Sequence, residues 1–405
     1  MKTMSAVTTC RFARLLLAST FLFLVAAGCS RYVGNFTSSS SISDAKAITN
    51  RTSTGDIPAN LKSFEVDNRF GAVHVTATDS GPTQWSWKLT VGAKTDTLAV
   101  QAADAASCVA TRQDGEGLRL VVSLPQSAGG LSFQSDLEIR VPKSVALRTR
   151  NLFGETTISG STGDIEATGQ NGSVEVRDAT GKVHAQTSFA SLVVKGAGPA
   201  WLKNQNGSIE AANIHGPLDA ETSFATLHAQ DIDGALDARD QNGRIEALRI
   251  KGRANIKTSF ADIHAEGIAG DATLADQNGR ISARDITGSV DAHTSFANLE
   301  IESTGHNFKC RNQNGTIQLH ASSPEVATID AQTSFAGIEV FLPAGLKPAI
   351  QARTTFAEVE SDFPVMMKPE GQNALAEADP ASPRITLKNQ NGPIRIVGEK
   401  STAAR

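Results

Sequence analysis

The sequence predicts an all-β fold: a single-stranded β-solenoid (β-helix) with about 18 residues per coil, capped by irregular β segments at both ends. Two observations predict it. Each coil along much of the 405-residue chain has one of two motifs, Gln-Asn-Gly or Thr-Ser-Phe-Ala, and the two motifs alternate from coil to coil. Between them, apolar and polar residues alternate with period two in short runs broken by glycine, as in half-buried strands joined by tight turns. A unit this short cannot bury its own apolar face, so we expect the units to stack.

Residues 1–28 are predicted to be an export signal. Three basic residues precede an apolar run at 15–25, which is too short to span a bilayer but suits a signal peptide. The run ends in Ala-Ala-Gly-Cys, which resembles a bacterial lipobox with Cys29 as the lipidated residue, although Ala26 stands where leucine is usual. An ordinary secretory signal that contains a cysteine is the alternative.

The residue after the predicted lipidation site is Ser30. By resemblance to Gram-negative lipoproteins, a residue other than aspartate there permits transfer to the outer membrane, and several acyl chains would anchor the protein firmly. We therefore expect an exported protein, bound to the bacterial cell envelope by its lipid anchor and located at the outer membrane. Residues 29–60 are rich in Ser, Thr and Asn, and are expected to be a flexible tether.

Residues 61–150 alternate like strands but lack the 18-residue rhythm. Wider coils of the same solenoid and a small capping β-sandwich are both compatible with this pattern. The segments 68–71 (Asn-Arg-Phe-Gly) and 151–154 (Asn-Leu-Phe-Gly) look like two copies of one corner. At the other end, residues 361–383 are expected to be a loop insertion, residues 384–398 a last strand unit and residues 399–405 a tail.

Residues 151–360 hold the 18-residue repeat, with Phe and Asn alternating at one corner of successive coils. Phenylalanine outnumbers tyrosine 17 to 1, and this corner explains much of the excess. We expect the rings to point into the core, about 10 Å apart, with Asn-Gly between them in turns that need positive φ. The column is interpreted as structural, not as a binding face. We call it the corner column; its members are Phe189, Asn206, Phe224, Asn242, Phe260, Asn278, Phe296, Asn314, Phe335 and Phe356.

Two segments outside the repeat carry a family resemblance. Residues 64–75 read Phe-Glu-Val-Asp-Asn-Arg-Phe-Gly-Ala-Val-His-Val, and residues 141–154 end in Arg-Asn-Leu-Phe-Gly, before repeated Asn-Gly-x-Ile units. Over about residues 60–397 the chain resembles a family of bacterial β-strand-repeat proteins of unknown function known as putative adhesins, as a lipoprotein member. The resemblance implies the fold and surface attachment, and it transfers no ligand-binding residue.

Composition excludes several classes of protein. A net charge of −4 gives no basic surface to neutralise phosphates, so nucleic acid is not an expected partner. Four cysteines are too few for a disulfide scaffold. Cys108 and Cys310 lie far apart in the repeat order, so two separate buried thiols are favoured over a disulfide between them.

Two columns of polar residues are candidate binding sites. His228 and His264 flank Glu246 on successive coils; a solvated face is the favoured interpretation and a metal site the alternative. Residues Arg244, Asp262 and Arg280 are expected to stack as an exposed charge ladder rather than a ligand site. We expect no metal and no cofactor.

Catalysis is not expected either. The coils are at most slightly longer than the basic repeat unit, which leaves no long loops to wall an active site, and no catalytic motif is present. The sequence therefore predicts a non-enzymatic, lipid-anchored envelope protein, an adhesin or scaffold that presents a repetitive surface to an envelope protein or a glycan. A self-assembling β-helical scaffold is one alternative, a glycan-active β-helix enzyme another, and the oligomeric state stays open.

Overall fold

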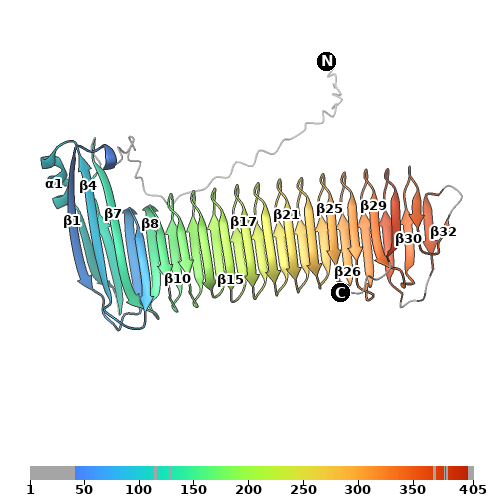
Figure 1. The fold of residues 1–405 in the computed structure, drawn as a ribbon, viewed down its shortest axis with the longest axis horizontal. Helices are drawn as coiled ribbons and strands as arrows, with labels where there is room; N and C mark the ends of the chain where they lie inside the picture. Colours follow the sequence, from blue (N-terminus) through green and yellow to red (C-terminus); the bar gives the residue numbers. More distant parts are fainter. Residues whose placement is uncertain are drawn as a thin grey trace, which may run out of the picture. The chain divides into compact units, whose positions relative to one another are not determined.

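The computed structural model describes residues 42–113, 116–126, 130–367, 371–377, 379 and 382–399. They belong to one structural unit, Ser40–Arg405. Nearly all of its regular structure is β, in two sheets whose strands lie side by side along the unit (Figure 1). These long stacks of parallel strands are consistent with the predicted β-solenoid.

Each coil of the repeat gives one strand to each sheet. Sheet B contains β8 (Ala146–Phe153), β10 (Ile165–Gly169), β12 (Val183–Thr187), β14 (Ala200–Asn204), β16 (Leu218–Glu221), β18 (Leu236–Arg239), β20 (Ala254–Lys257), β22 (Ala272–Ala275), β24 (Val290–His293), β26 (Asn307–Arg311) and β28 (Thr328–Gln332). Sheet A contains β9 (Thr156–Ser159), β11 (Val174–Arg177), β13 (Leu192–Ala197), β15 (Ile209–Ile214), β17 (Leu227–Ile232), β19 (Ile245–Ile250), β21 (Ile263–Ile268), β23 (Ile281–Ile286), β25 (Leu299–Ser303), β27 (Ile317–Ala321) and β29 (Ile338–Pro343).

The register places equivalent residues of successive coils next to one another. Leu236 pairs with Leu218 on one side and with Ala254 on the other, so each partner lies one repeat unit away in sequence. Alternate side chains of each strand are buried between the sheets, where they form columns of like residues. One such column, predicted from the sequence, consists of Ile214, Ile232, Ile250, Ile268 and Ile286.

The strands of sheet A bend at one fixed position. Seven successive coils have a residue with φ between 51° and 71° there: Asp178, Gly196, Asn213, Asp231, Arg249, Gly267 and Asp285. The residue in this left-handed conformation turns the chain, so that the side chain of the next residue points into the core. In five of the seven coils that next residue is an isoleucine. Gly, Asn and Asp tolerate the conformation best, and Arg249 is the least suited of the seven.

The N-terminal region is neither wider coils alone nor a separate sandwich. Three antiparallel strands extend sheet A, and a hairpin of β5 and β6 extends sheet B. Their bounds are β1 (Ala47–Asp56), β4 (Gln84–Ala93), β7 (Ser132–Pro142), β5 (Ser107–Gln113) and β6 (Gly117–Ser123), and a short 3-10 helix, η1, covers Ile42–Asp44. The prediction of a tether up to residue 60 is therefore wrong for β1, which pairs with β4 along its whole length.

An α-helix that the sequence did not predict, α1 (Asp96–Ala105), packs on β1 and β4. Thr95 caps its first turn by accepting a hydrogen bond from the backbone N of Leu98, at 3.3 Å. At its other end, the Arg51 guanidinium of β1 donates to the carbonyl of Ala103 at 2.9 Å. The buried residues of α1 are all alanines, so its apolar signal is weak. No helix among residues 42–399, where described, is long and apolar enough to cross a membrane.

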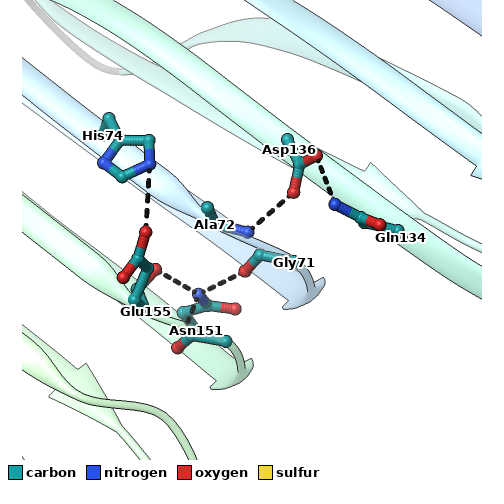
Figure 2. Close-up of polar contacts among 8 residues, drawn as sticks. Gly71, Ala72, His74, Gln134, Asp136, Asn151 and Glu155 are labelled. Atoms are coloured by element: carbon teal, nitrogen blue, oxygen red, sulfur yellow. Dashed lines mark hydrogen bonds and ion pairs between the residues drawn. The ribbon is translucent and has the colours of Figure 1, made fainter.

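The first coil, β2 (Ser63–Phe70) and β3 (Val73–Thr78), lies between coils that follow it in sequence. Strand β2 pairs with β6 and β8, and β3 pairs with β7 and β9. The two predicted corner copies meet here, because Phe70 stacks on Phe153 with ring centroids 5.1 Å apart. Figure 2 shows the polar contacts of this corner, where the Asn151 amide donates to the Gly71 carbonyl at 2.9 Å and the Asp136 carboxylate accepts from the Ala72 backbone N at 2.9 Å.

The C-terminal end repeats this arrangement. Its strands are β30 (Ala349–Arg353), β31 (Val359–Ser361), β32 (Met366–Met367), β33 (Asn373–Ala376), β34 (Arg384–Lys388) and β35 (Ile394–Glu399). Strand β34 pairs with β28 and β30, and β35 pairs with β29 and β31. The strand unit 384–398, expected to come last, therefore lies between the coils of β28 and β30. The predicted loop insertion, 361–383, contributes β32 and β33, and β33 pairs antiparallel with both β30 and β32.

Candidate functional site

The corner column forms one turn of each coil, where the chain passes from sheet B to sheet A. The six phenylalanines named above are 59% to 72% exposed, which makes them the most exposed group of large apolar side chains among the described residues. The prediction that these rings point into the core is wrong. They stand outward, one on every second coil, roughly 10 Å apart if each coil advances one strand spacing.

The residue two places before each ring takes the inward position instead. In phenylalanine coils it is a buried threonine; Thr187, for example, donates its hydroxyl to the carbonyl of Gly172 in the coil before, at 2.9 Å. The same bond recurs at Thr222, Thr258, Thr294, Thr333 and Thr354. With threonine turned in, the bend turns phenylalanine out, and the chain points inward again at Leu192, three residues after Phe189.

The Asn-Gly coils use the corner differently. The side-chain amide of Asn206 donates to the Ser188 carbonyl of the phenylalanine coil before it, at 3.1 Å. Equivalent bonds are made by Asn242, Asn278, Asn314 and Asn391. The glycine is needed for close approach, because a Cβ on Gly207 would lie 2.1 Å from the Ala190 carbonyl oxygen. The expected positive φ is not found at this corner; it occurs in sheet A instead.

The displaced C-terminal coil completes the alternation. In sequence, Phe335 is followed by Phe356 with no Gln-Asn-Gly between them. In space, the coil of Asn391 lies between the two, since the Asn391 backbone N donates to the Ser334 carbonyl and the Phe356 backbone N to the Gln390 carbonyl. The order of exposed ring and Asn-Gly is therefore unbroken from Phe189 to Phe356.

Two carboxyl groups are buried under the column. In three Asn-Gly coils, the inward residue is an asparagine whose amide donates to an alanine carbonyl, as Asn204 does to Ala190 at 2.7 Å. Asp240 and Asp276 occupy the same position in two other coils, and each has one buried carboxylate oxygen with no hydrogen-bond partner. Burial raises the pKa of both carboxyl groups above the ordinary value.

A second feature is a groove of about 870 Å³ on the outer side of sheet B, near the N-terminal end of the repeat. His184 and Trp201 line it and stack with ring centroids 4.0 Å apart. Trp201 is half-buried, whereas the other two tryptophans are buried. The volume lies in the range of small-molecule sites.

The carboxylates of this groove are engaged with basic groups or backbone. Glu166 contacts Arg148 at 2.7 Å, Asp219 contacts Arg239 at 3.2 Å, and Asp164 accepts from the backbone N of Lys182 at 3.0 Å.

The column of His228, Glu246 and His264 does not form one connected group. His228 contacts Glu246 at 3.1 Å, whereas His264 contacts Glu266 of its own strand at 3.4 Å. No group of three His, Cys, Asp or Glu side chains in the described part of the chain could hold a metal ion.

The predicted charge ladder is partly formed. Arg244 contacts Asp262 at 3.5 Å, and Asp262 accepts from the backbone N of Arg280 at 3.0 Å. The guanidinium of Arg280 turns to Glu300 in the next coil.

Cys108 and Cys310 are separate free thiols, as expected, but the prediction that both are buried is confirmed only for Cys310. Cys108 is half-buried in β5, Cys310 is fully buried in β26, and neither is in a disulfide. Burial raises the pKa of each thiol to about 12. Cys29 lies outside the described residues.

No family model matches the chain, and no curated protein matches it. Three solved structures are similar. They are a "putative cell adhesion protein" from Clostridium sporogenes (8% identity, TM-score 0.21, covering 87% of this chain and 100% of that one), a "putative adhesin" from Bacteroides fragilis (16%, 0.26, 68% and 97%) and a "putative adhesin" from Parabacteroides distasonis (10%, 0.28, 68% and 98%). The description of the second and third structures, putative adhesin, is also the name of the family that the sequence resembles.

Proposed function

We propose that this protein is a non-enzymatic, lipid-anchored protein of the bacterial cell envelope, an adhesin or binding scaffold that holds a partner on its repetitive surface. The observation that best supports a binding role is the corner column, in which six phenylalanines are exposed at equivalent positions. The six phenylalanines repeat at one outward position of the coil, where burial in the core does not account for an apolar residue. An exposed apolar array of this size commonly marks an interaction site.

A binding role is favoured over catalysis by the contacts of the polar groups. The groove carboxylates described above are held by basic side chains or backbone. Turns of the repeat are short, so they build no walls around a reaction centre.

The ends are proposed to act as caps on a body of 18-residue coils. Helix α1 with β1 at one end, and β32 with β33 at the other, extend the sheets with antiparallel pairing. Such segments limit edge-to-edge association of open sheets.

Anchoring is proposed to occur through Cys29, the cysteine of the lipobox-like segment. The test is membrane fractionation of the full-length protein beside a Cys29→Ser variant. The wild-type protein is expected in the envelope fraction, extractable with detergent, and the variant in the soluble exported fraction. Equal membrane association of the two proteins would contradict the anchor and leave the binding proposal open.

The binding role is tested with the mature Cys29→Ser chain, incubated with washed cells, cell-wall fractions and envelope extracts. Retention on at least one fraction is expected, and replacing the six column phenylalanines by alanine should abolish it. The matched control removes exposed apolar side chains elsewhere, at Ile48, Val109 and Leu375, and should bind like the parent. No retention on any fraction, or equal retention of the six-alanine variant, would contradict the proposed site.

A further inference from the structure

The corner column has the geometry of a binding site for a linear polymer. Its exposed rings stand in single file, one residue wide, and every second coil contributes one. Successive rings are separated by two strand spacings, roughly 10 Å. A partner that uses all six must itself repeat at that interval along a line.

The sides of the column are uncharged. The residues next to each ring are Ser or Thr before it and Ala after it, and the intervening coils present Gln, Asn and Gly. The nearest charged column, at Arg244 and Asp262, begins two residues further on and has both signs. Such a surface gives no electrostatic attraction to a charged polymer. It therefore suits a polymer that carries no charge.

Amide groups alternate with the rings. The glutamines before each Asn-Gly are exposed, and within the described residues their side-chain amides have no hydrogen-bond partner: Gln170, Gln205, Gln241, Gln277, Gln313 and Gln390. Each amide offers two donors and an acceptor, which suit hydroxyl groups. The line of rings is therefore flanked, one residue before the corner in every intervening coil, by a free hydrogen-bonding group.

A second copy of the chain fits this surface less well. Six phenylalanines at about 60% exposure offer roughly 600 Å² of aromatic surface. A standard protein interface takes about 800 Å² from each partner and is broad rather than linear. The mature chain is also acidic, 35 basic residues against 42 acidic ones, so two parallel copies would repel each other.

We propose that the corner column binds a neutral, extended β-1,4-linked polysaccharide, with one sugar ring stacked on each phenylalanine. In such a chain every sugar is flipped relative to the next, so the same face recurs at every second ring, a distance close to two strand spacings. The apolar C–H face of a pyranose packs on an aromatic plate, and its equatorial hydroxyls reach the glutamine amides beside it. This inference rests on the proposed binding function and names its ligand.

Many weak contacts along one chain add through multivalency. Each ring alone binds one sugar weakly, but a polymer that engages six rings at once is held far more tightly. The affinity for soluble β-1,4-linked oligosaccharides should therefore rise with chain length until the oligosaccharide spans from Phe189 to Phe356.

The test is co-sedimentation of the mature Cys29→Ser chain with cellulose and chitin, both neutral and β-1,4-linked. Starch, whose glucose units are α-linked and coil instead of extending, is the shape control. We expect binding to at least one β-linked polymer and none to starch. The six Phe→Ala substitutions should weaken it about a hundredfold, the loss expected when multivalent contact is removed.

Two further variants identify the kind of contact. Six Phe→Leu substitutions keep apolar surface but remove the flat ring, and should also weaken binding. The Ile48, Val109 and Leu375 alanine variant should bind normally. Circular dichroism checks that each variant remains folded, and a variant with only Phe260, Phe296 and Phe335 replaced, expected to bind at an intermediate level, keeps the test decisive if the six-fold variant does not fold.

Several outcomes would overturn the inference. Retention on envelope fractions without binding to cellulose or chitin rejects the glycan while the proposed function stands. Loss of binding on Trp201→Ala, with no loss on the six Phe→Ala substitutions, moves the glycan to the groove on sheet B. A dimer in analytical ultracentrifugation that dissociates on Phe→Ala, without glycan binding, assigns the column to a second copy.

Discussion

The side-chain amide of Asn391 donates a 2.9 Å hydrogen bond to the backbone carbonyl of Ser334, a residue 57 positions earlier in the chain. Everywhere else in the corner column the same bond joins residues 18 or 19 apart. The coil of Asn391 has therefore entered the stack between two coils that precede it in sequence.

A chain that ends after residue 382 should lose order at the end of the stack. It lacks β34 and β35, so β28 and β29 each lose one of their two neighbours, and β30 and β31 lose their parallel partners. Hydrogen exchange is expected to become fast in β30 and β31, while β17 to β21 keep their protection because repeat stacks depend on nearest neighbours. Uniform loss of protection along the chain would contradict this.

Replacing Asp240 and Asp276 by asparagine should stabilise the protein at neutral pH, by about 1 kcal/mol for each hydrogen bond gained. Asparagine at this position donates to an alanine carbonyl in three other coils. The carboxylates have no such donor, and each keeps an unpaired buried oxygen.

The pH dependence follows from the raised pKa of both carboxyl groups. The folded state holds these protons more tightly than the unfolded chain, whose pKa is near 3.8. The stability of the wild-type protein, relative to that of the double asparagine variant, is therefore highest in acid and falls as the pH rises through the folded pKa. Urea unfolding at a series of pH values measures it, and a constant difference between the two proteins would refute the assignment.

Gly207→Ala should destabilise the fold by more than about 2 kcal/mol, because the new Cβ would lie 2.1 Å from a backbone carbonyl. Gly267→Ala should cost about 1 kcal/mol, since its φ of 71° is unfavourable but the nearest atoms lie 3.5 Å away. Gly345→Ala, with no atom within 4 Å of the new Cβ, is the control. Thermal unfolding should rank the variants in that order, and equal costs for the first two would show that close approach is unimportant.

Exposed and buried phenylalanines should differ sharply in their effect on stability. Alanine in place of Phe260, a column member that is 63% exposed, is expected to change the free energy of unfolding by less than about 0.5 kcal/mol. Alanine in place of the buried Phe308 should cost about 3–5 kcal/mol. Denaturant titration compares them directly, and a large cost at Phe260 would mean that its ring packs inward.

Thiol chemistry offers an independent test of burial. With the pKa of Cys108 and of Cys310 raised to about 12, both thiols are protonated at pH 8 and should react slowly with Ellman's reagent in the native mature Cys29→Ser chain. Both should react at once after unfolding in guanidinium. Rapid reaction of Cys310 in the native state would contradict its place in the core.

Much of the fold can be predicted from periodicity, because alternation in the strands fixes which side chains face inward. Ile245 and Ala247 are buried as expected. The orientation of Phe260 could not be predicted in this way, because it lies in a turn, where alternation stops applying.

Other differences come from contacts between distant parts of the chain. Helix α1 was missed because its buried residues are all small, so its apolar stripe is weak. The sequence of strand β1 favours a tether because its residues are mostly polar and exposed, and only pairing with β4 orders it. The place of β34 and β35 depends on pairing between segments that are several coils apart in sequence, such as Ile329 with Ile385, which local patterns do not encode.

The displaced coils also bear on the order in which the chain reaches its native state. The middle of the stack can grow coil by coil as the polypeptide emerges, since each strand pairs with its equivalent in the coil before it. The first coil, however, is fully paired only when β9, which ends at residue 159, is present. The coil of Phe356 gains its parallel neighbour only when β35, which ends at residue 399, is present. Folding therefore cannot proceed strictly from one terminus to the other. The middle coils can pair in the order of the sequence, but each end of the stack is completed only by a segment that comes later in the chain than its neighbours.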